Sequence, residues 1–216
     1  MAGESSDITL YHAVPTRSCR VLFLLEELGL PYKLVKKEFK PFGLRDDVEY
    51  CASIHPRGSL PGFKDGETVI IESIAILQYL IEQYDPEHKM SPPLSDKPAR
   101  AAYLNWLTFA EASYASSVVF PVMHMFVLPE EARNPTAAAS FKKSAEENLK
   151  ILDKALEGKP KGIVNNEFSA ADIALYQTTY LAAEFLKMIT PETYPNVAAW
   201  YAETAKRPAA VKAYEA

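Results

Sequence analysis

Residues 59–73 read Ser-Leu-Pro-Gly-Phe-Lys-Asp-Gly-Glu-Thr-Val-Ile-Ile-Glu-Ser, and this stretch indicates the fold more clearly than any other. Runs with apolar residues, at 60–63 and 67–71, flank the tripeptide Lys-Asp-Gly. Asp-Gly between such runs is typical of a tight β-hairpin, because both residues suit the turn conformations that join antiparallel strands. After Glu72 and Ser73, apolar residues recur at helical spacing to about Tyr84. The stretch therefore predicts a hairpin followed directly by an amphipathic helix.

The sequence before the hairpin predicts a strand, a helix and a second strand. Ile8 and Leu10 alternate with less apolar residues, which is typical of a short strand, and residues 12–15 interrupt that pattern. From about residue 16, leucines and valines recur at helical spacing until Gly29, a residue that suits the position after a helix. Residues 32–35 predict the second strand. Strands joined by one helix favour a parallel, right-handed crossover.

The sequence after the hairpin predicts helices alone. Residues 85–98 carry four of the sixteen prolines and little apolar periodicity, which is typical of a linker. Helical periodicity follows near residues 99–117, 136–156, 170–186 and 197–206, with a short terminal turn after residue 208. We therefore predict an α/β domain at residues 1–84, a linker at residues 85–98 and an all-α domain at residues 99–216.

Composition excludes several classes of function. The chain has 216 residues, of which 48% are hydrophobic, and its net charge of −5 offers no basic field for nucleic acid. Cys19 and Cys51 are the only cysteines, which fits a reducing compartment. Residues 1–7 are polar and lack the apolar core of a secretory signal. The most apolar run, residues 118–128, is interrupted by Pro121 and His124 and is too short to cross a bilayer. We expect a soluble, cytoplasmic protein with neither nucleic-acid nor membrane partners.

Five local sequences resemble the cytosolic glutathione transferase family, in that family's order and spacing. They are residues 21–31 (Val-Leu-Phe-Leu-Leu-Glu-Glu-Leu-Gly-Leu-Pro), 55–61 (His-Pro-Arg-Gly-Ser-Leu-Pro), 71–75 (Ile-Glu-Ser-Ile-Ala), 168–173 (Phe-Ser-Ala-Ala-Asp-Ile) and 206–209 (Lys-Arg-Pro-Ala). The resemblance covers almost the whole chain. It implies a thioredoxin-like N-terminal domain that binds glutathione as co-substrate, a helical domain with a pocket for an electrophile, no other cofactor, and a homodimer.

Leu60 and Pro61 are candidates for binding the backbone of glutathione. Proline lacks an amide hydrogen and tolerates a cis bond, which turns the N–H and C=O of the preceding residue outward, where an extended peptide can pair with them. The resemblance implies that the Leu60–Pro61 bond is cis and that the cysteinyl backbone of glutathione pairs there. The sequence alone favours a trans bond and an edge-strand proline.

Glu72 and Ser73 are candidates for holding the γ-glutamyl end of glutathione. They precede a predicted helix, whose free amides and positive dipole end suit a carboxylate. Ser73 can donate to that carboxylate, and Glu72 can accept the neighbouring α-ammonium. The alternative is that Ser73 is an N-cap and Glu72 a partner of the helix dipole. The remaining candidates for contacts with glutathione are Arg17, Ser59 and, at the glycine carboxylate, Lys40 or Arg45.

Residues 15–20, Pro-Thr-Arg-Ser-Cys-Arg, stand where the resemblance places the activated sulfur of glutathione. In that family a side chain at the start of the first helix holds the thiolate. Lowering a thiol pKa from about 8.5 to neutrality requires about 1.4–2.8 kcal/mol. One hydroxyl, at about 1.5–3 kcal/mol, together with a helix terminus suffices.

The catalytic hydroxyl is either Thr16 or Ser18. When the chain is aligned with the family on Arg20, Thr16 falls near the position of the activating serine, whereas Ser18 is the nearest actual serine. Tyr11 lies inside the predicted strand, too early in the chain for the tyrosine-type arrangement. The alternative is that one of the two hydroxyls caps the helix. We expect Cys19 to be a packed thiol one residue into the helix, with a redox role left open.

The electrophile pocket is expected in an aromatic and methionine-rich segment of the helical domain. The candidates are Tyr114, Phe120, Met123 and His124, and core packing is the alternative for each. Residues 169–172 read as a structural capping-box variant. The four histidines have no metal-ligand spacing, so we expect no metal site.

The sequence thus predicts a glutathione transferase of the serine/threonine type, class unassigned, that conjugates or reduces hydrophobic electrophiles or peroxides with the glutathione thiolate. The first alternative is a non-catalytic glutathione-binding or interaction module. The second is a glutathione-dependent isomerase or thiol oxidoreductase.

Overall fold

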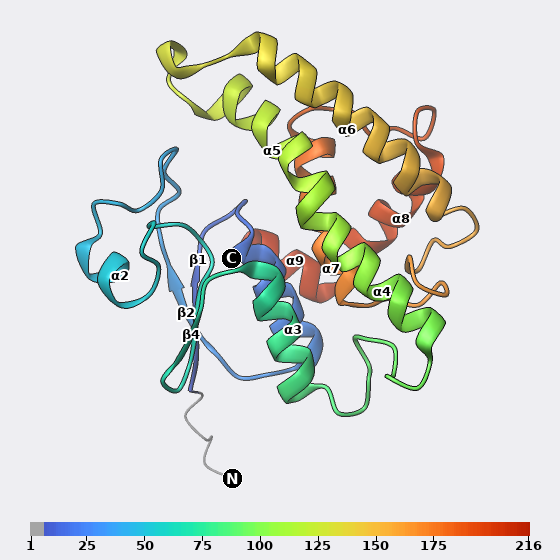
Figure 1. Cartoon of the computed structure of the whole chain (residues 1–216), viewed down its shortest axis with the longest axis horizontal. Helices are drawn as coiled ribbons and strands as arrows, with labels where there is room; N and C mark the ends of the chain where they lie inside the picture. The colour runs from blue at the N-terminus through green and yellow to red at the C-terminus, as the bar shows by residue number, and fades with distance from the viewer. Residues whose placement is uncertain (1–6) are drawn as a thin grey trace. The chain divides into compact units, whose positions relative to one another are not determined.

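A computed structural model describes residues 7–216 of the chain, and these residues form two compact units (Figure 1). The first unit comprises the described residues up to Pro86 together with Pro208–Ala216, and the second comprises Glu87–Arg207. The predicted ranges count residues 208–216 with the helical domain, whereas the structure groups them with the first unit. Apart from Asp7, the N-terminal stretch that predicts no secretory signal lies outside the described residues.

The first unit contains a four-stranded mixed sheet and its helices. Its elements are β1 (Ile8–His12), α1 (Ser18–Leu28), β2 (Lys33–Lys36), α2 (Val48–Ser53), β3 (Gly62–Asp65), β4 (Thr68–Ile70), α3 (Ser73–Tyr84) and α9 (Pro208–Glu215). The strand order is β2-β1-β3-β4, with β1 parallel to β2 and the other pairs antiparallel. The predicted thioredoxin-like domain, including its parallel crossover, is confirmed.

Alternation along β1 sets the core of this unit. Ile8, Leu10 and His12 are buried, whereas the residues between them are partly exposed. Helix α1 contacts both α3 and α9, and its residues from Ser18 to Leu25 are all buried. Because α1 is covered on more than one side, it carries apolar residues around most of its circumference. Its contact with α9 explains why the end of the chain belongs to the first unit.

The β3–β4 hairpin is present as predicted, but its turn lies at Gly66 and Glu67, because Lys64 and Asp65 are still paired within the sheet. Asp65 pairs with Thr68, and Gly66 opens the turn with a φ of +56°, a conformation that glycine adopts without a steric penalty. Gly29, with a φ of +63°, ends α1 in the same left-handed region. The predicted helix end at Gly29 is therefore confirmed, and the predicted hairpin is confirmed with its turn one residue later than Asp-Gly.

Helix α2 lies between the second strand and the hairpin, in a segment for which the sequence pattern predicts no helix or strand. Asp47 caps it, because the Asp47 carboxylate accepts the Tyr50 N–H at 3.0 Å. Tyr50 is the only buried residue of this short helix. One buried position provides no helical period, so the sequence pattern could not reveal it. In Figure 1, α2 lies on the other side of the strands from α3.

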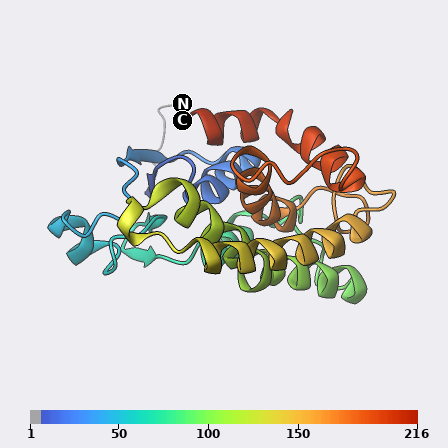
Figure 2. The same cartoon turned by 90° about the horizontal axis from the view of Figure 1, so that it is seen from above.

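The second unit is helical, as predicted. Its elements are α4 (Lys97–Phe109), the π-helical turn η1 (Ala110–Ala115), α5 (Ser116–Val122), the π-helical turn η2 (Met123–Val127), the 3₁₀ turn η3 (Glu130–Ala132), α6 (Pro135–Ala155), α7 (Ala170–Glu184) and α8 (Pro195–Ala205). Helix α6 runs alongside α5 (Figure 2). Among residues 7–216, no helix combines the length and apolar character that crossing a bilayer requires.

The helix predicted near residues 99–117 continues in the structure to residue 127. Pro121 lies within α5, and π-helical turns stand on both sides of that short helix. A proline removes one helical hydrogen bond, and wider turns are a known way for a helix to accommodate such a defect. The sequence predicted no helix beyond residue 117, because the proline and the wider turns interrupt the regular helical period.

Asp172 is the buried polar centre of the second unit. Its carboxylate accepts the Ile163 N–H at 2.8 Å, the Trp200 indole N–H at 2.9 Å and the Ser169 N–H at 3.0 Å. Ser169 and Asp172 form the predicted capping box at the start of α7. Burial raises the pKa of Asp172 to about 6, against the opposing effect of these hydrogen bonds.

Candidate functional site

The connection from β1 to α1 is closed by short backbone hydrogen bonds. The Thr16 N–H donates to the Ala13 carbonyl at 2.9 Å, and α1 then begins at Ser18. Arg17, the N-cap residue, makes no side-chain capping bond. Instead, the Thr16 hydroxyl accepts the Ser18 N–H at 3.2 Å. The sequence alternative that a hydroxyl caps this helix therefore holds for Thr16.

Three side chains form a hydrogen-bonded cluster at this helix start. The Thr16 and Ser18 hydroxyl oxygens lie 2.7 Å apart, and Ser18 Oγ lies 2.8 Å from His12 Nδ1. Ser18 is fully buried, whereas Thr16 is partly exposed. Of the two hydroxyls that the sequence left as candidates, Thr16 is the one that a ligand can reach.

Cys19 is a packed thiol, as predicted. Its side chain is fully buried, and burial raises its pKa to about 12. A thiol with this pKa is protonated at neutral pH and is a poor nucleophile. These properties weigh against a redox role for Cys19.

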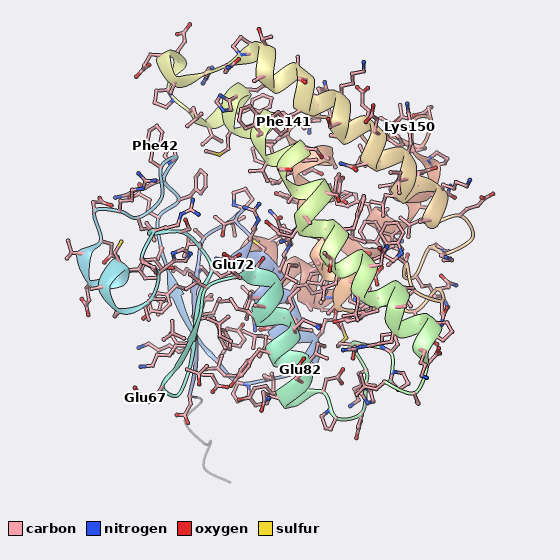
Figure 3. The ribbon with its side chains drawn as sticks, in the orientation of Figure 1. Phe42, Glu67, Glu72, Glu82, Phe141 and Lys150 are labelled. Atoms are coloured by element: carbon pink, nitrogen blue, oxygen red, sulfur yellow. The ribbon has the colours of Figure 1, made fainter. Side chains whose placement is uncertain are left out.

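A second candidate region is the start of α3. Glu72 is the exposed N-cap, and Ser73, which is 3% exposed, is the first helical residue (Figure 3). The alternative that Ser73 is the N-cap is therefore wrong. The Ser73 hydroxyl accepts a hydrogen bond from the fully buried Arg20 guanidinium at 3.1 Å. A guanidinium donor and a helix N-terminus both suit a carboxylate at this position.

The Leu60–Pro61 bond is cis, as the family resemblance implies. Pro61 directly precedes β3, whose first residue, Gly62, pairs with Tyr11 of β1. The Tyr50 hydroxyl donates to the Ser59 carbonyl at 2.7 Å. A Cβ at Gly62 would lie 2.6 Å from that hydroxyl, so the absence of a side chain there allows Tyr50 to approach. Tyr50 thus anchors the segment that carries Ser59 and Leu60.

Removing this anchor gives a first prediction. Tyr50→Phe is expected to lower the free energy of unfolding by about 1 kcal/mol, because the Ser59 carbonyl loses its donor. Amide hydrogen exchange should also accelerate at residues 58–60. Tyr84→Phe is the matched control, since it removes a tyrosine bond to Asp65 in the β3–β4 hairpin instead. Unchanged exchange at residues 58–60 in the Tyr50→Phe protein would contradict an anchoring role.

The basic candidates of the first unit do not all gather at one place. Arg17 is partly exposed at the start of α1. Lys40 forms an exposed ion pair with Asp46 at 2.6 Å, and Arg45 is exposed. The contacts of Lys40 therefore do not connect it with the start of α1 or α3.

The four candidates for the electrophile pocket in the second unit differ in exposure. Tyr114 is fully buried and stacks with Phe109 at a centroid distance of 6.2 Å, as core packing requires. Phe120, Met123 and His124 are partly exposed. The Phe120 and His124 rings lie 4.0 Å apart, and His124 Nδ1 accepts the Asn134 N–H at 3.0 Å. Within residues 7–216, no group of three or more His, Cys, Asp or Glu side chains could hold a metal ion.

Sequence reasoning missed three residues that support the site. His12 contacts Ser18, Arg20 contacts Ser73, and Tyr50 holds Ser59. The sequence does contain a signal for His12 and for Arg20. His12 occupies an inward position in the alternation of β1, and Arg20 lies between apolar residues of α1. A polar side chain on a buried face usually has a specific partner.

Comparison with known proteins agrees with the resemblance in the sequence. The family model described as "Glutathione S-transferase, N-terminal domain" matches residues 6–82, and the model described as "Glutathione S-transferase, C-terminal domain" matches residues 117–216. The glutathione S-transferase-like protein OpS6 of Beauveria bassiana is 34% identical over 212 residues, covering 95% of this chain and 93% of the relative. Glutathione S-transferase GstB of Escherichia coli is 31% identical over 196 residues, covering 89% and 90%.

Solved structures share the complete fold. Ure2p5 from Phanerochaete chrysosporium, cocrystallised with 1-(S-glutathionyl)-2,4-dinitrobenzene, has a TM-score of 0.84 at 26% identity and covers 99% of this chain and 95% of its own. The theta class glutathione S-transferase of Xanthomonas axonopodis pv. citri, with glutathione bound, has a TM-score of 0.82 at 27% identity. The match covers 98% of this chain and 99% of that structure.

Proposed function

Because this chain belongs to the glutathione S-transferase family, we propose that it binds glutathione in its first unit and uses the thiolate to conjugate a hydrophobic electrophile or to reduce a peroxide. The observation that carries this proposal is the partly exposed Thr16 hydroxyl at the start of α1. A hydroxyl at a helix N-terminus offers both a hydrogen bond and a favourable dipole to a thiolate. Thr16 is thus the proposed catalytic residue.

Ser73 is the proposed partner of the γ-glutamyl carboxylate. Its hydroxyl oxygen accepts from Arg20, so its own proton remains available for a ligand. The buried guanidinium increases the attraction for an anion at that position. Exposed Glu72 is the proposed partner of the neighbouring α-ammonium. The backbone of Leu60 is the proposed partner of the cysteinyl backbone of glutathione. Ser59 adds a contact in the same segment.

Ser73→Ala is expected to weaken glutathione binding by about 1–3 kcal/mol, roughly fivefold to 150-fold in Kd, because a buried charged hydrogen bond is lost. Isothermal titration calorimetry measures this change directly. Cysteinylglycine, which lacks the γ-glutamyl group, should bind the wild-type and variant proteins equally.

Ser53→Ala is the matched control for this experiment. Its hydroxyl is exposed on α2 and donates to the Glu49 carbonyl of its own helix, so its loss should leave the Kd for glutathione unchanged. Equal affinity of the Ser73→Ala and wild-type proteins for glutathione would remove Ser73 from the binding site.

Three assays distinguish the proposed reaction from its alternatives. The proposal predicts conjugation of an aromatic halide or reduction of an organic peroxide, with a rate that follows the thiolate population. Reduction of a mixed disulfide as the main activity would favour a thiol oxidoreductase, which the buried, protonated Cys19 does not support. Glutathione binding without turnover in any assay would favour a binding module.

The proposal extends to features that rest on family likeness. We propose that the protein is a cytoplasmic homodimer. Light scattering can measure the mass of the particle in solution. We also propose that Phe120, Met123 and His124 contact the hydrophobic co-substrate, because aromatic and methionine side chains accept varied ligands. Tyr114 supports this segment from the core. Lys40 remains the proposed partner of the glycine carboxylate, and Arg17 remains a proposed contact near the thiol.

A further inference from the structure

His12 is a buried polar residue whose hydrogen bonds are only partly satisfied. Its side chain is 1% exposed, and its Nδ1 atom lies 2.8 Å from Ser18 Oγ. Its other ring nitrogen, Nε2, is buried and has no hydrogen-bond partner among the described residues. Such an incomplete arrangement is uncommon and calls for an explanation.

The unpartnered nitrogen determines which tautomer of His12 is favoured. A neutral imidazole carries its proton on one nitrogen and a lone pair on the other. A proton on Nε2 would bury an N–H donor without an acceptor, and orphaned buried donors are rarer than orphaned acceptors. The favoured tautomer therefore carries the proton on Nδ1, which then donates to Ser18 Oγ.

This tautomer fixes the direction of the next hydrogen bond. Ser18 Oγ also accepts the Ala13 N–H at 3.2 Å, so its two lone pairs are both occupied. Its single proton can be donated to Thr16 Oγ1 at 2.7 Å or to the Ala13 carbonyl at 3.3 Å. The shorter bond, to Thr16, is favoured.

The Thr16 hydroxyl also has both of its lone pairs occupied, which leaves only its proton for a further hydrogen bond. Thr16 Oγ1 accepts from the Ser18 hydroxyl at 2.7 Å and from the Ser18 N–H at 3.2 Å. With both lone pairs occupied, this hydroxyl can only donate to a further partner. Because Thr16 is the partly exposed member of the cluster, the free donor is the one that a ligand can reach.

We propose that His12 is a positioning residue which, through Ser18, orients the Thr16 hydroxyl as a hydrogen-bond donor to the sulfur of glutathione. This inference rests on the proposed function, in which Thr16 stabilises the thiolate. His12 itself touches no reacting atom. Each donor in the chain polarises the next, so the last one, at the sulfur, is strengthened.

The environment of His12 keeps its ring neutral, as the chain requires. Burial, together with the nearby charge of Lys36 on the neighbouring strand β2, lowers the pKa of His12 to about 4. A proton on both nitrogens would leave the Nε2–H donor buried without an acceptor. The direction of the chain is therefore the same throughout the neutral pH range.

The tautomer can be observed without any ligand. In ¹⁵N-histidine-labelled wild-type protein, long-range ¹H–¹⁵N correlation spectra distinguish a protonated Nδ1 from a protonated Nε2. The His12→Asn variant assigns the signal by its disappearance. The expected result is a neutral ring with the proton on Nδ1 at neutral pH. A proton on Nε2, or a doubly protonated ring, would overturn the inference.

The effect on the sulfur is tested with two variants of similar shape. The asparagine amide of His12→Asn can place an N–H near the original Nδ1, whereas His12→Leu has no donor. Ultraviolet absorbance of the bound thiolate is recorded against pH. His12→Leu is expected to raise the apparent pKa of bound glutathione by about 0.3–0.7, a twofold to fivefold loss of thiolate below that pKa. His12→Asn is expected to restore at least half of this change.

A purely structural role for His12 gives a different pattern. Both variants would then change stability and glutathione affinity alike and leave the pKa of the bound thiol at its wild-type value, which would overturn the inference while the proposed function stands. If wild-type protein binds glutathione without lowering the thiol pKa, the proposed function fails and the inference fails with it. If His12→Leu does not fold, the wild-type tautomer decides the question.

Discussion

Thr16→Val is expected to raise the apparent pKa of bound glutathione by about 1–2 and to lower kcat/KM at neutral pH by about tenfold to 100-fold. Valine has nearly the shape of threonine but cannot donate a hydrogen bond, so the thiolate loses its stabilising partner. The Kd for glutathione should change little at about pH 6, where the thiol itself is bound. The pH dependence of kcat/KM with an aromatic halide measures the effect.

Two controls separate chemistry from folding in this experiment. Thr16→Ser keeps the hydroxyl and should keep at least a large part of the activity. Because the Thr16 hydroxyl also caps α1, Thr16→Val should reduce stability by about 0.5–2 kcal/mol, which urea unfolding detects. A pH profile of the Thr16→Val protein that coincides with the wild-type profile would exclude Thr16 as the activating residue.

Asp172→Ala is expected to lower the free energy of unfolding by about 3–5 kcal/mol. The substitution leaves the Ile163 and Ser169 amides and the Trp200 indole N–H buried without their acceptor. Three orphaned donors in the interior of one helical unit cost more than the loss of a cap on the surface. Denaturant unfolding, monitored by tryptophan fluorescence, measures the change.

Asp153→Ala is the matched control for Asp172→Ala. Asp153 also accepts from backbone amides at the start of a helix, those of Asn196 and Val197 of α8, but it is partly exposed. Its removal should cost about 0.5–2 kcal/mol. Similar losses for both variants would contradict the central role of Asp172.

The pH dependence of the Asp172 contribution has a definite sign. Its pKa is raised from 3.8 to about 6 by burial, so the folded protein binds this proton more tightly than the unfolded chain does. The resulting stabilisation is fully present below about pH 4 and is lost as pH rises through about 6. The stability difference between wild type and Asp172→Ala should therefore decrease over that range.

The fold could be predicted where one period dominates the sequence. The alternation in β1, the helical spacing in α1 and the Asp-Gly turn each predicted their element correctly. Helix α2 was missed because it buries one residue, and the helical structure beyond residue 117 was missed because Pro121 and the π-helical turns interrupt its regular period. The grouping of α9 with the first unit depends on a contact with α1 that no local pattern encodes.

The site could be predicted only as far as its local motifs. Pro61 and Ser73 stand in recognisable sequence contexts, whereas the choice between Thr16 and Ser18 depends on burial. The links from His12 to Ser18 and from Arg20 to Ser73 join different elements, so a sequence pattern could not have paired them. These contacts arise only when β1, α1 and α3 are assembled.

A crystal structure of the glutathione complex tests the central claim most directly. We predict that the sulfur lies within about 3.5 Å of Thr16 Oγ1 and that the γ-glutamyl carboxylate lies within hydrogen-bond distance of the Ser73 hydroxyl. The cysteinyl backbone should pair with the backbone of Leu60. A sulfur held by another group, with Thr16 Oγ1 out of hydrogen-bond range, would contradict the account.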